Sequence, residues 1–266
     1  MKYLYFSKGL RELNQAQLID WVVQGKLDGL DLAVRPGYAI NPENVRKELP
    51  AFVQSLKDAG GVVGLITAPT GMNRPDDPMA VTLFEAAGKA GVPFIKIGYF
   101  PYRGDFSREL KEARGQLKGF AKLAERTGVR ALHHTHSGSN FGNNGVASAW
   151  LLEEIDPHFV GVLLDPGHLS LCGGPFAMEF DAVRTHVAML SLKDMAQSRA
   201  PGKVESSSTV VQAGKGQVAW DKVGQTLKKA RFSGMASIHA EYDVKDLEER
   251  KRLLAAELEF FKSRFP

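Results

Sequence analysis

The chain has 266 residues, of which 44% are hydrophobic and 24% are charged, and its formal net charge is +4. This composition is typical of a globular protein with an ample core, and the single cysteine, Cys172, excludes an intrachain disulfide. Basic residues are spread along the chain, so nucleic-acid binding is not expected. No apolar run approaches the roughly 20 residues of a membrane span, and the N-terminus lacks the apolar core of a secretory signal, so we expect a cytoplasmic protein.

Short apolar runs alternate along the chain with longer amphipathic segments. The runs are rich in Val, Ile, Leu and aromatic residues and are mostly continuous, which is typical of strands buried on both faces of a parallel sheet. They lie at residues 3–6, 29–34, 62–66, 93–97, 129–132, 160–164, 187–192 and 236–239.

The intervening segments carry helix start and stop signals. Asn14 and Asn41 are candidate N-caps, with Pro42 after the second one, and Pro50 is expected to kink or split the helix that follows. The predicted helices occupy residues 14–25, 41–60, 78–91, 107–128, 146–154, 181–186, 220–230 and 244–261.

Eight strand–helix units predict a single (β/α)8 TIM barrel that spans residues 1–266 as one domain. An open doubly wound sheet is the alternative, and the lack of a Gly-x-Gly-x-x-Gly motif after the first strand disfavours it. Residues 197–216 are rich in Gly and Ser, and we interpret them as a long loop after the seventh strand that could close over the site.

Polar side chains gather at the ends of the predicted strands, where a barrel of this kind has its active site. Five of the seven histidines lie at such ends. Side chains alternate along a strand, so residues two apart share a face. One face at the barrel mouth therefore combines His134, His136, Asp165, Lys193, His239 and Glu241. Imidazoles and carboxylates from several strands suit either a divalent metal site or proton transfer next to a carbonyl.

In this order the motifs resemble the xylose isomerase-like TIM barrel superfamily, the sugar phosphate isomerase/epimerase group. The resemblance rests on His-Ser-Gly at 136–138, Leu-Asp-Pro-Gly-His at 164–168, Leu-Lys-Asp at 192–194, Gly-Lys-Gly-Gln-Val-Ala-Trp at 214–220 and His-Ala-Glu-Tyr at 239–242. An Arg-Pro-Gly at 35–37 matches a subgroup, and the resemblance covers roughly residues 28 to 242.

The resemblance implies a divalent metal (Mn, Mg, Zn or Co) held by Glu, Asp, His and Glu from the last four strands. In this chain those positions fall on His134, Asp165, Ser191 and His239, with Glu241 two residues further on. Only Asp165 keeps its residue type, and serine is a poor ligand for a divalent metal. Either the metal is absent, or a rearranged set of His134, Asp165 and His239, with or without Glu241, binds it.

The leading hypothesis is a sugar or keto-sugar isomerase or epimerase that moves a proton next to a carbonyl, with a small carbohydrate as its partner. Glu241 is the expected base, Lys193 and His136 are the other catalytic candidates, and Arg35, His168 and Tyr99 bind substrate. A lyase or dehydratase on the same scaffold, an endonuclease-IV-like phosphodiesterase and a non-catalytic sugar-binding barrel are the alternatives. Barrels of this type often pair, so a homo-oligomer is compatible with the sequence.

Overall fold

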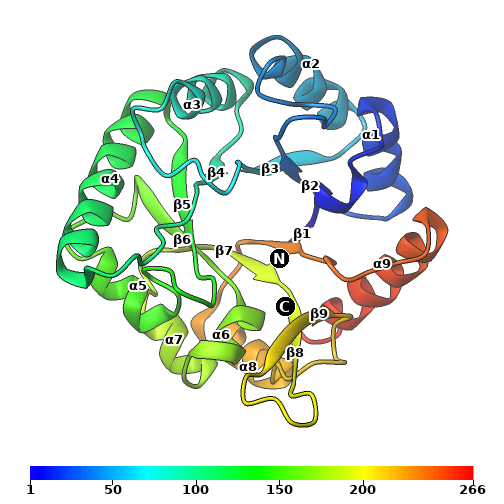
Figure 1. Cartoon of the computed structure of the whole chain (residues 1–266). Coiled ribbons are helices and arrows are strands. Elements are labelled where there is room, and N and C mark those ends of the chain that lie inside the picture. Colours follow the sequence, from blue (N-terminus) through cyan, green and yellow to red (C-terminus); the bar gives the residue numbers. More distant parts are fainter. Residues whose placement is uncertain (266) are drawn as a thin grey trace.

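The computed structural model describes residues 1–265, in which parallel strands close into a barrel surrounded by helices (Figure 1). Around the barrel the strands follow the order β1-β10-β7-β6-β5-β4-β3-β2. Their bounds are Lys2–Phe6 (β1), Gly29–Ala33 (β2), Val62–Thr67 (β3), Phe94–Lys96 (β4), Arg130–His134 (β5), Val160–Leu164 (β6), Val187–Leu192 (β7) and Met235–Ile238 (β10). The (β/α)8 barrel is therefore confirmed, and the open sheet is excluded.

The helices pack on the outside of the barrel; the expected cap Asn14 is confirmed, whereas Asn44 and not Asn41 stands at the start of α2. Asn14 forms a capping box at α1, and Asp77 and Asp105 cap α3 and α4. Their bounds are Gln15–Gln24 (α1), Val45–Asp58 (α2), Pro78–Ala90 (α3), Phe106–Thr127 (α4), Gly145–Leu151 (α5), Pro166–Cys172 (α6), Phe176–Ala182 (α7), Trp220–Ala230 (α8) and Leu247–Lys262 (α9), and a short 3-10 helix spans Ser7–Leu10. Among residues 1–265, no helix is both long and apolar enough to cross a membrane.

Three helices differ from the predictions. The helix predicted at 181–186 is wrong: residues 181 and 182 are the end of α7, and residues 183–186 form a turn. The helix α6 was not predicted. Pro166 and Gly167 resemble a turn in sequence, yet Asp165 caps the backbone of His168 and Pro166 occupies the first turn of α6. The helix at α2 runs through Pro50 without splitting and starts only at Val45.

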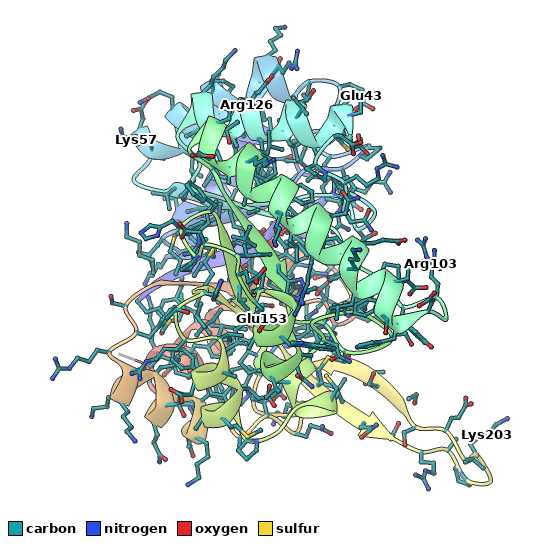
Figure 2. The ribbon with its side chains drawn as sticks, turned by 90° about the vertical axis from the view of Figure 1, so that its left-hand side faces the viewer. Glu43, Lys57, Arg103, Arg126, Glu153 and Lys203 are labelled. Atoms are coloured by element: carbon teal, nitrogen blue, oxygen red, sulfur yellow. The ribbon has the colours of Figure 1, made fainter. Side chains whose placement is uncertain are left out.

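The expected long loop after the seventh strand is wrong as well, because most of it is an antiparallel hairpin. Its strands are Asp194–Ser198 (β8) and Ser207–Val211 (β9). The hairpin projects from the barrel, and Figure 2 shows Lys203 near its tip. Residues 207–209 are exposed, so no buried face produces an apolar pattern in this part of the sequence.

A closed apolar floor fills the barrel below the mouth. It consists of Leu4, Leu65, Leu132, Leu163 and Met189, which pack together separately from the core between strands and helices. Because side chains alternate along each strand, the inward-facing residues two positions further on lie above this floor. They are Phe6, Thr67, His134, Asp165 and Ser191. The floor thus fixes where the polar groups of the mouth begin.

Candidate active site

Asp165 organises the first group at the mouth. Ser191 Oγ donates to Asp165 Oδ2 at 2.6 Å, and His134 Nε2 lies 3.2 Å from the same oxygen. Tyr99 Oη lies 3.2 Å from His134 Nδ1. Burial would raise the pKa of Asp165, but the nearby His168 and the bond from His134 lower it. Burial also holds the pKa of His134 well below its usual range, so a neutral His134 donates to an ionised Asp165 and accepts from Tyr99.

Asp31 organises a second group on the opposite strands of the barrel. Its carboxylate accepts from Thr67 Oγ1 at 2.6 Å and from Ser237 Oγ at 3.0 Å, and His239 Nε2 lies 3.1 Å from Oδ2. The His239 ring stacks on Phe6 with centroids 4.4 Å apart. Burial alone would lower the pKa of His239, but its bond to Asp31 and the Glu241 carboxylate 3.6 Å from Nδ1 outweigh that cost and raise the pKa. His239 is therefore the imidazole at the mouth that favours the charged form.

Glu241 is clamped between two lysines. Its carboxylate lies 2.6 Å from Lys193 Nζ and 2.6 Å from Lys8 Nζ. Burial would raise the pKa of Glu241, but the bond to His239 and the charge of Lys193 hold it far below its usual range. An anion stabilised in this way is a weak base. The predicted base thus reaches the site, but its surroundings favour a role in holding Lys193.

His168 and His136 lie next to this clamp with their rings 3.7 Å apart. Lys193 Nζ, which can only donate, lies 3.3 Å from His168 Nε2, so His168 Nδ1 carries the proton and bonds Ser137 Oγ at 2.9 Å. Burial lowers the pKa of His168 to about 3 and also lowers the pKa of His136. Both rings are therefore neutral near pH 7.

The tautomer of His136 follows from its one hydrogen-bond partner. His136 Nδ1 lies 2.9 Å from the carbonyl oxygen of Ser137, which can only accept, so Nδ1 carries the proton. Nε2 then has a free lone pair, and no group within residues 1–265 bonds to it. The side chain is only partly buried, whereas His134 and His168 are buried. His136 is thus a partly exposed imidazole of the mouth with a nitrogen free to accept a proton.

Two cations of the mouth have no carboxylate partner among residues 1–265. Lys96 is 2% exposed, makes no hydrogen bond or ion pair, and places Nζ 3.9 Å from the centre of the Tyr99 ring. Arg35 lies over Phe6, 5.9 Å from the ring centre, and its buried Nε has no hydrogen-bond partner. An unpaired basic side chain is unusual in a protein interior, so the buried Lys96 and the half-buried Arg35 with its unpaired Nε indicate where substrate binds.

The residues at the mouth do not fit a divalent metal. No three His, Cys, Asp or Glu side chains within residues 1–265 form a group that could hold one. Of the predicted ligands, His134 and Asp165 bond each other, whereas His239 bonds Asp31. Ser191 at the usual histidine position donates to Asp165 and offers no ligand lone pair of comparable strength.

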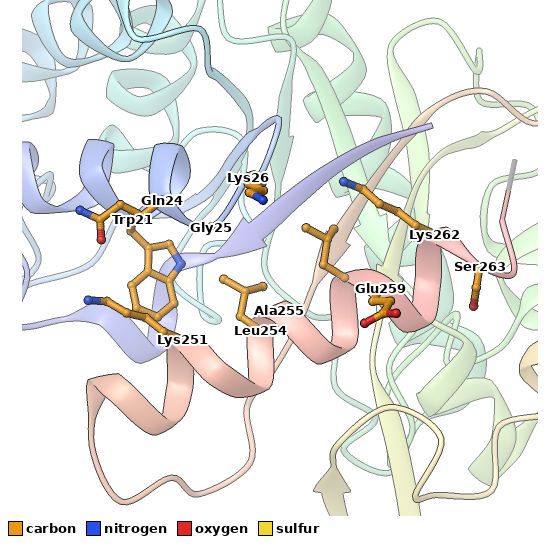
Figure 3. A pocket seen from close by; sticks show the side chains of 11 residues that line it. Trp21, Gln24, Gly25, Lys26, Lys251, Leu254, Ala255, Glu259, Lys262 and Ser263 are labelled. Carbon is orange, nitrogen blue, oxygen red and sulfur yellow. The ribbon is translucent and has the colours of Figure 1, made fainter.

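The larger cavities of the protein lie away from these groups. One groove of about 600 Å³ runs between α1 and α9, with Trp21 and Leu254 in its wall (Figure 3). Its lining is mostly apolar, and its charged side chains are Lys26, Lys251, Glu259 and Lys262. Unlike the mouth, the groove does not combine imidazoles, carboxylates and lysines in one cluster.

All nine predicted site residues lie at the mouth or contact a residue of the mouth. The sequence analysis left out Asp31, Lys96, Thr67, Ser237 and Lys8. The first four are polar residues at inward-facing positions of otherwise apolar strands. The alternation of inward-facing and outward-facing side chains along each strand was the signal that could have found them. Lys8 could not be found in this way, because it lies in the 3-10 helix after β1.

The chain belongs to the xylose isomerase-like TIM barrel family, whose model matches residues 19–264. Inosose dehydratase 2 of Bacillus cereus is 26% identical over 136 residues, which are 48% of this chain and 45% of that protein. The match thus spans less than half the length of this curated relative.

Solved structures of the same fold cover the whole chain. D-Psicose 3-epimerase in the presence of D-fructose superposes with a TM-score of 0.74 at 15% identity, over 99% of both chains. The IOLI protein with a bound zinc atom superposes with a TM-score of 0.76 at 15% identity, over 100% of this chain and 99% of that one. At such identities these likenesses show the shared fold alone.

Proposed function

We propose that this protein is an isomerase or epimerase that moves a proton next to the carbonyl of a small keto-sugar. The observation that carries the proposal is the free Nε2 of His136 at the same barrel mouth as the positively charged Lys193 and Arg35. A proton-transfer enzyme needs both a base and positive charge for the enediolate oxygens. The comparisons support the substrate class, because they include an epimerase and a dehydratase of sugar-like compounds.

In the proposed reaction, His136 Nε2 takes the proton from the carbon next to the carbonyl and returns it to a neighbouring position. Lys193 and His239, whose pKa is raised by Asp31 and Glu241, stabilise the negative charge that develops on oxygen. Arg35, His168 and Tyr99 bind the hydroxyl groups and the carbonyl oxygen. Glu241 holds Lys193 in place. No step needs a metal ion as ligand to the sugar.

Deuterium uptake from solvent tests this proposal directly. The protein is incubated in D2O with D-fructose, D-psicose or an inosose, and proton NMR follows the hydrogens next to the carbonyl. We expect their signals to disappear faster with protein than with buffer alone for at least one compound. Binding without exchange across the panel would contradict the proposal and favour the non-catalytic sugar-binding barrel.

A dehydratase is the second candidate, and the charged His239 favours it. After proton removal, a hydroxyl two carbons from the carbonyl can leave as water if an acid protonates it. A raised pKa makes His239 a suitable acid. Formation of an enone, followed by its ultraviolet absorbance, would distinguish this outcome from isomerisation.

A further inference from the structure

We propose that Lys96 is a nucleophile that forms an imine with the carbonyl carbon of the substrate. This inference rests on the proposed function for the identity of that substrate. The amine itself can be tested with any small ketone.

The place of Lys96 in the barrel favours this role. It is the last residue of β4 and pairs in register with Thr67 on β3 and Leu132 on β5. Leu132 belongs to the apolar floor, so the Lys96 stem emerges from that floor and its amine points to the mouth. The Tyr99 ring, 3.9 Å from Nζ, limits where the amine can lie. A carbonyl carbon entering the mouth would meet Nζ at the base of the site.

The charges around Lys96 favour its neutral form. Asp31 is committed to three other donors, and Glu241 is committed to Lys193 and Lys8. Burial, together with the nearby charges of Arg35 and Lys193, lowers the pKa of Lys96 to about 7. A lysine that is buried only to pack would be expected to pair its charge with a carboxylate. Desolvation beside other cations is instead the environment that activates an amine nucleophile.

The chemistry balances without a further reagent. The Nζ lone pair forms a bond to the carbonyl carbon, the carbonyl π electrons move to oxygen, and the nitrogen loses a proton while the oxygen gains one. The hydroxyl of the resulting neutral carbinolamine takes a proton from solvent and leaves as water, and the nitrogen lone pair forms the C=N bond of an iminium ion. His136 can then take the adjacent proton, and the C–H electrons move toward nitrogen to give an enamine. Reprotonation at carbon and addition of water release the product and restore the amine.

This role would explain how the site can acidify the substrate C–H group although its side chains do not fit a metal ion. In the iminium ion the positive charge is covalently attached to the reacting carbon skeleton. It therefore acidifies the neighbouring C–H group without an ion that binds two sugar oxygens.

Reductive trapping tests the proposal. The protein is incubated at pH 7 with dihydroxyacetone and sodium cyanoborohydride, and the adduct is located by peptide mass spectrometry. At this pH about half of an amine with a pKa of about 7 is neutral, against less than 0.1% of an exposed lysine. We expect Lys96 to be labelled about a hundredfold faster than Lys203 at the exposed hairpin tip.

Variants separate the imine from a merely electrostatic role. Lys96→Met and Lys96→Arg are both expected to abolish the fast adduct, whereas the control Lys203→Met keeps it. Solvent exchange on the sugar panel is expected to fall at least a hundredfold in both Lys96 variants, although Arg preserves the charge. Circular dichroism checks that the variants fold.

Each outcome decides one of the two proposals. If Lys96 is labelled no faster than Lys203, or if Lys96→Arg exchanges at the wild-type rate, the imine is overturned and the proton-transfer function stands on its own test. If Lys96 traps dihydroxyacetone rapidly but no sugar exchanges, the imine stands and the proposed function fails.

Discussion

His136 differs from the other imidazoles of the mouth in combining a free ring nitrogen with partial exposure. His134 and His168 each use both ring nitrogens in hydrogen bonds, whereas the buried Nδ1 of His239 has no hydrogen-bond partner but lies 3.6 Å from the Glu241 carboxylate. A buried, fully bonded imidazole must break a bond before it accepts a proton, which costs about 1–3 kcal/mol. The hydrogen bonds of each imidazole therefore determine which one can act as the base, and residue type alone does not show these bonds.

Replacing His136 tests this assignment. His136→Gln is expected to lower kcat for solvent exchange by about 10²–10⁴-fold, the usual contribution of a general base, with a small change in KM. Glu241→Gln is expected to lower kcat only about tenfold, because the amide oxygen still accepts from Lys193. The exposed His158→Gln is the control. If Glu241→Gln loses as much turnover as His136→Gln, Glu241 is the base that the sequence analysis chose.

The alternation of side chains along strands predicts most of the residues at the mouth, but not their partners. His134, Asp165 and Lys193 converge because strand positions two apart share a face. The clamp on Glu241 depends on Lys8, a residue that is 233 positions away and outside any strand. The low proton affinity of Glu241 comes from His239 and Lys193, and strand alternation does not show that these side chains pair with it, so the choice of base was beyond the sequence.

At the scale of elements, Asp194 joins the hairpin to the loop before α8. Its carboxylate accepts hydrogen bonds from the backbone of Met195, Gly214, Gly216 and Val218 and from Trp220 Nε1. A Cβ at Gly216 would collide with this carboxylate, which explains a glycine in the Gly-Lys-Gly motif. One carboxylate therefore holds the hairpin and the 214–220 segment together.

Removal of this carboxylate is expected to destabilise the fold. Asp194→Ala leaves several buried donors without an acceptor, and we expect the free energy of unfolding to fall by about 3 kcal/mol or more. Asp181→Ala, at an exposed position of α7, is the matched control and should change it by less than about 0.5 kcal/mol. Urea unfolding measures both. Equal values for the two variants would show that the Asp194 bonds contribute nothing net.

On α9, Glu257 links stability to pH. It is buried and accepts from the backbone of Ala213 at 2.9 Å, and burial raises its pKa to about 7. Between pH 4.5 and 7 the folded protein holds a proton that the unfolded chain releases, so this residue costs stability as pH rises through that window.

Glu257→Gln should therefore gain stability relative to wild type as pH rises from 5 to 8, by about 3 kcal/mol at most. Urea unfolding of both proteins at the two pH values measures this gain. The exposed Glu259→Gln on the same helix should show no such change. A constant difference between Glu257→Gln and wild type at both pH values would contradict the raised pKa.

The accuracy of the element predictions follows the strength of the apolar pattern. The barrel strands are buried on both faces and were all found to within a few residues. The exposed hairpin lacks that pattern, and α6 starts at a proline and glycine that resemble a turn. The hairpin is held in place by the bonds of Asp194 to residues 214–220. Elements that depend on such tertiary contacts cannot be recognised from the local sequence pattern.

At the scale of the whole molecule, the barrel brings cations to a mouth where the family resemblance implies a metal. These side chains come from the residue after β7 (Lys193), from β4 (Lys96) and from the segment after β2 (Arg35), and they meet only because the sheet closes. The carboxylates that could bind a metal are engaged by protein donors. The central claim is that the protein's own positive charges take over the stabilisation of the reacting carbonyl group.

Solvent exchange after exhaustive chelation tests that claim most directly. The protein is treated with EDTA, its metal content is measured by elemental analysis, and deuterium uptake by the responsive keto-sugar is compared with that of the untreated sample. The account predicts that the exchange rate stays within about twofold of the untreated rate. Loss of exchange on chelation, restored by Zn²⁺, Mn²⁺, Mg²⁺ or Co²⁺, would contradict it.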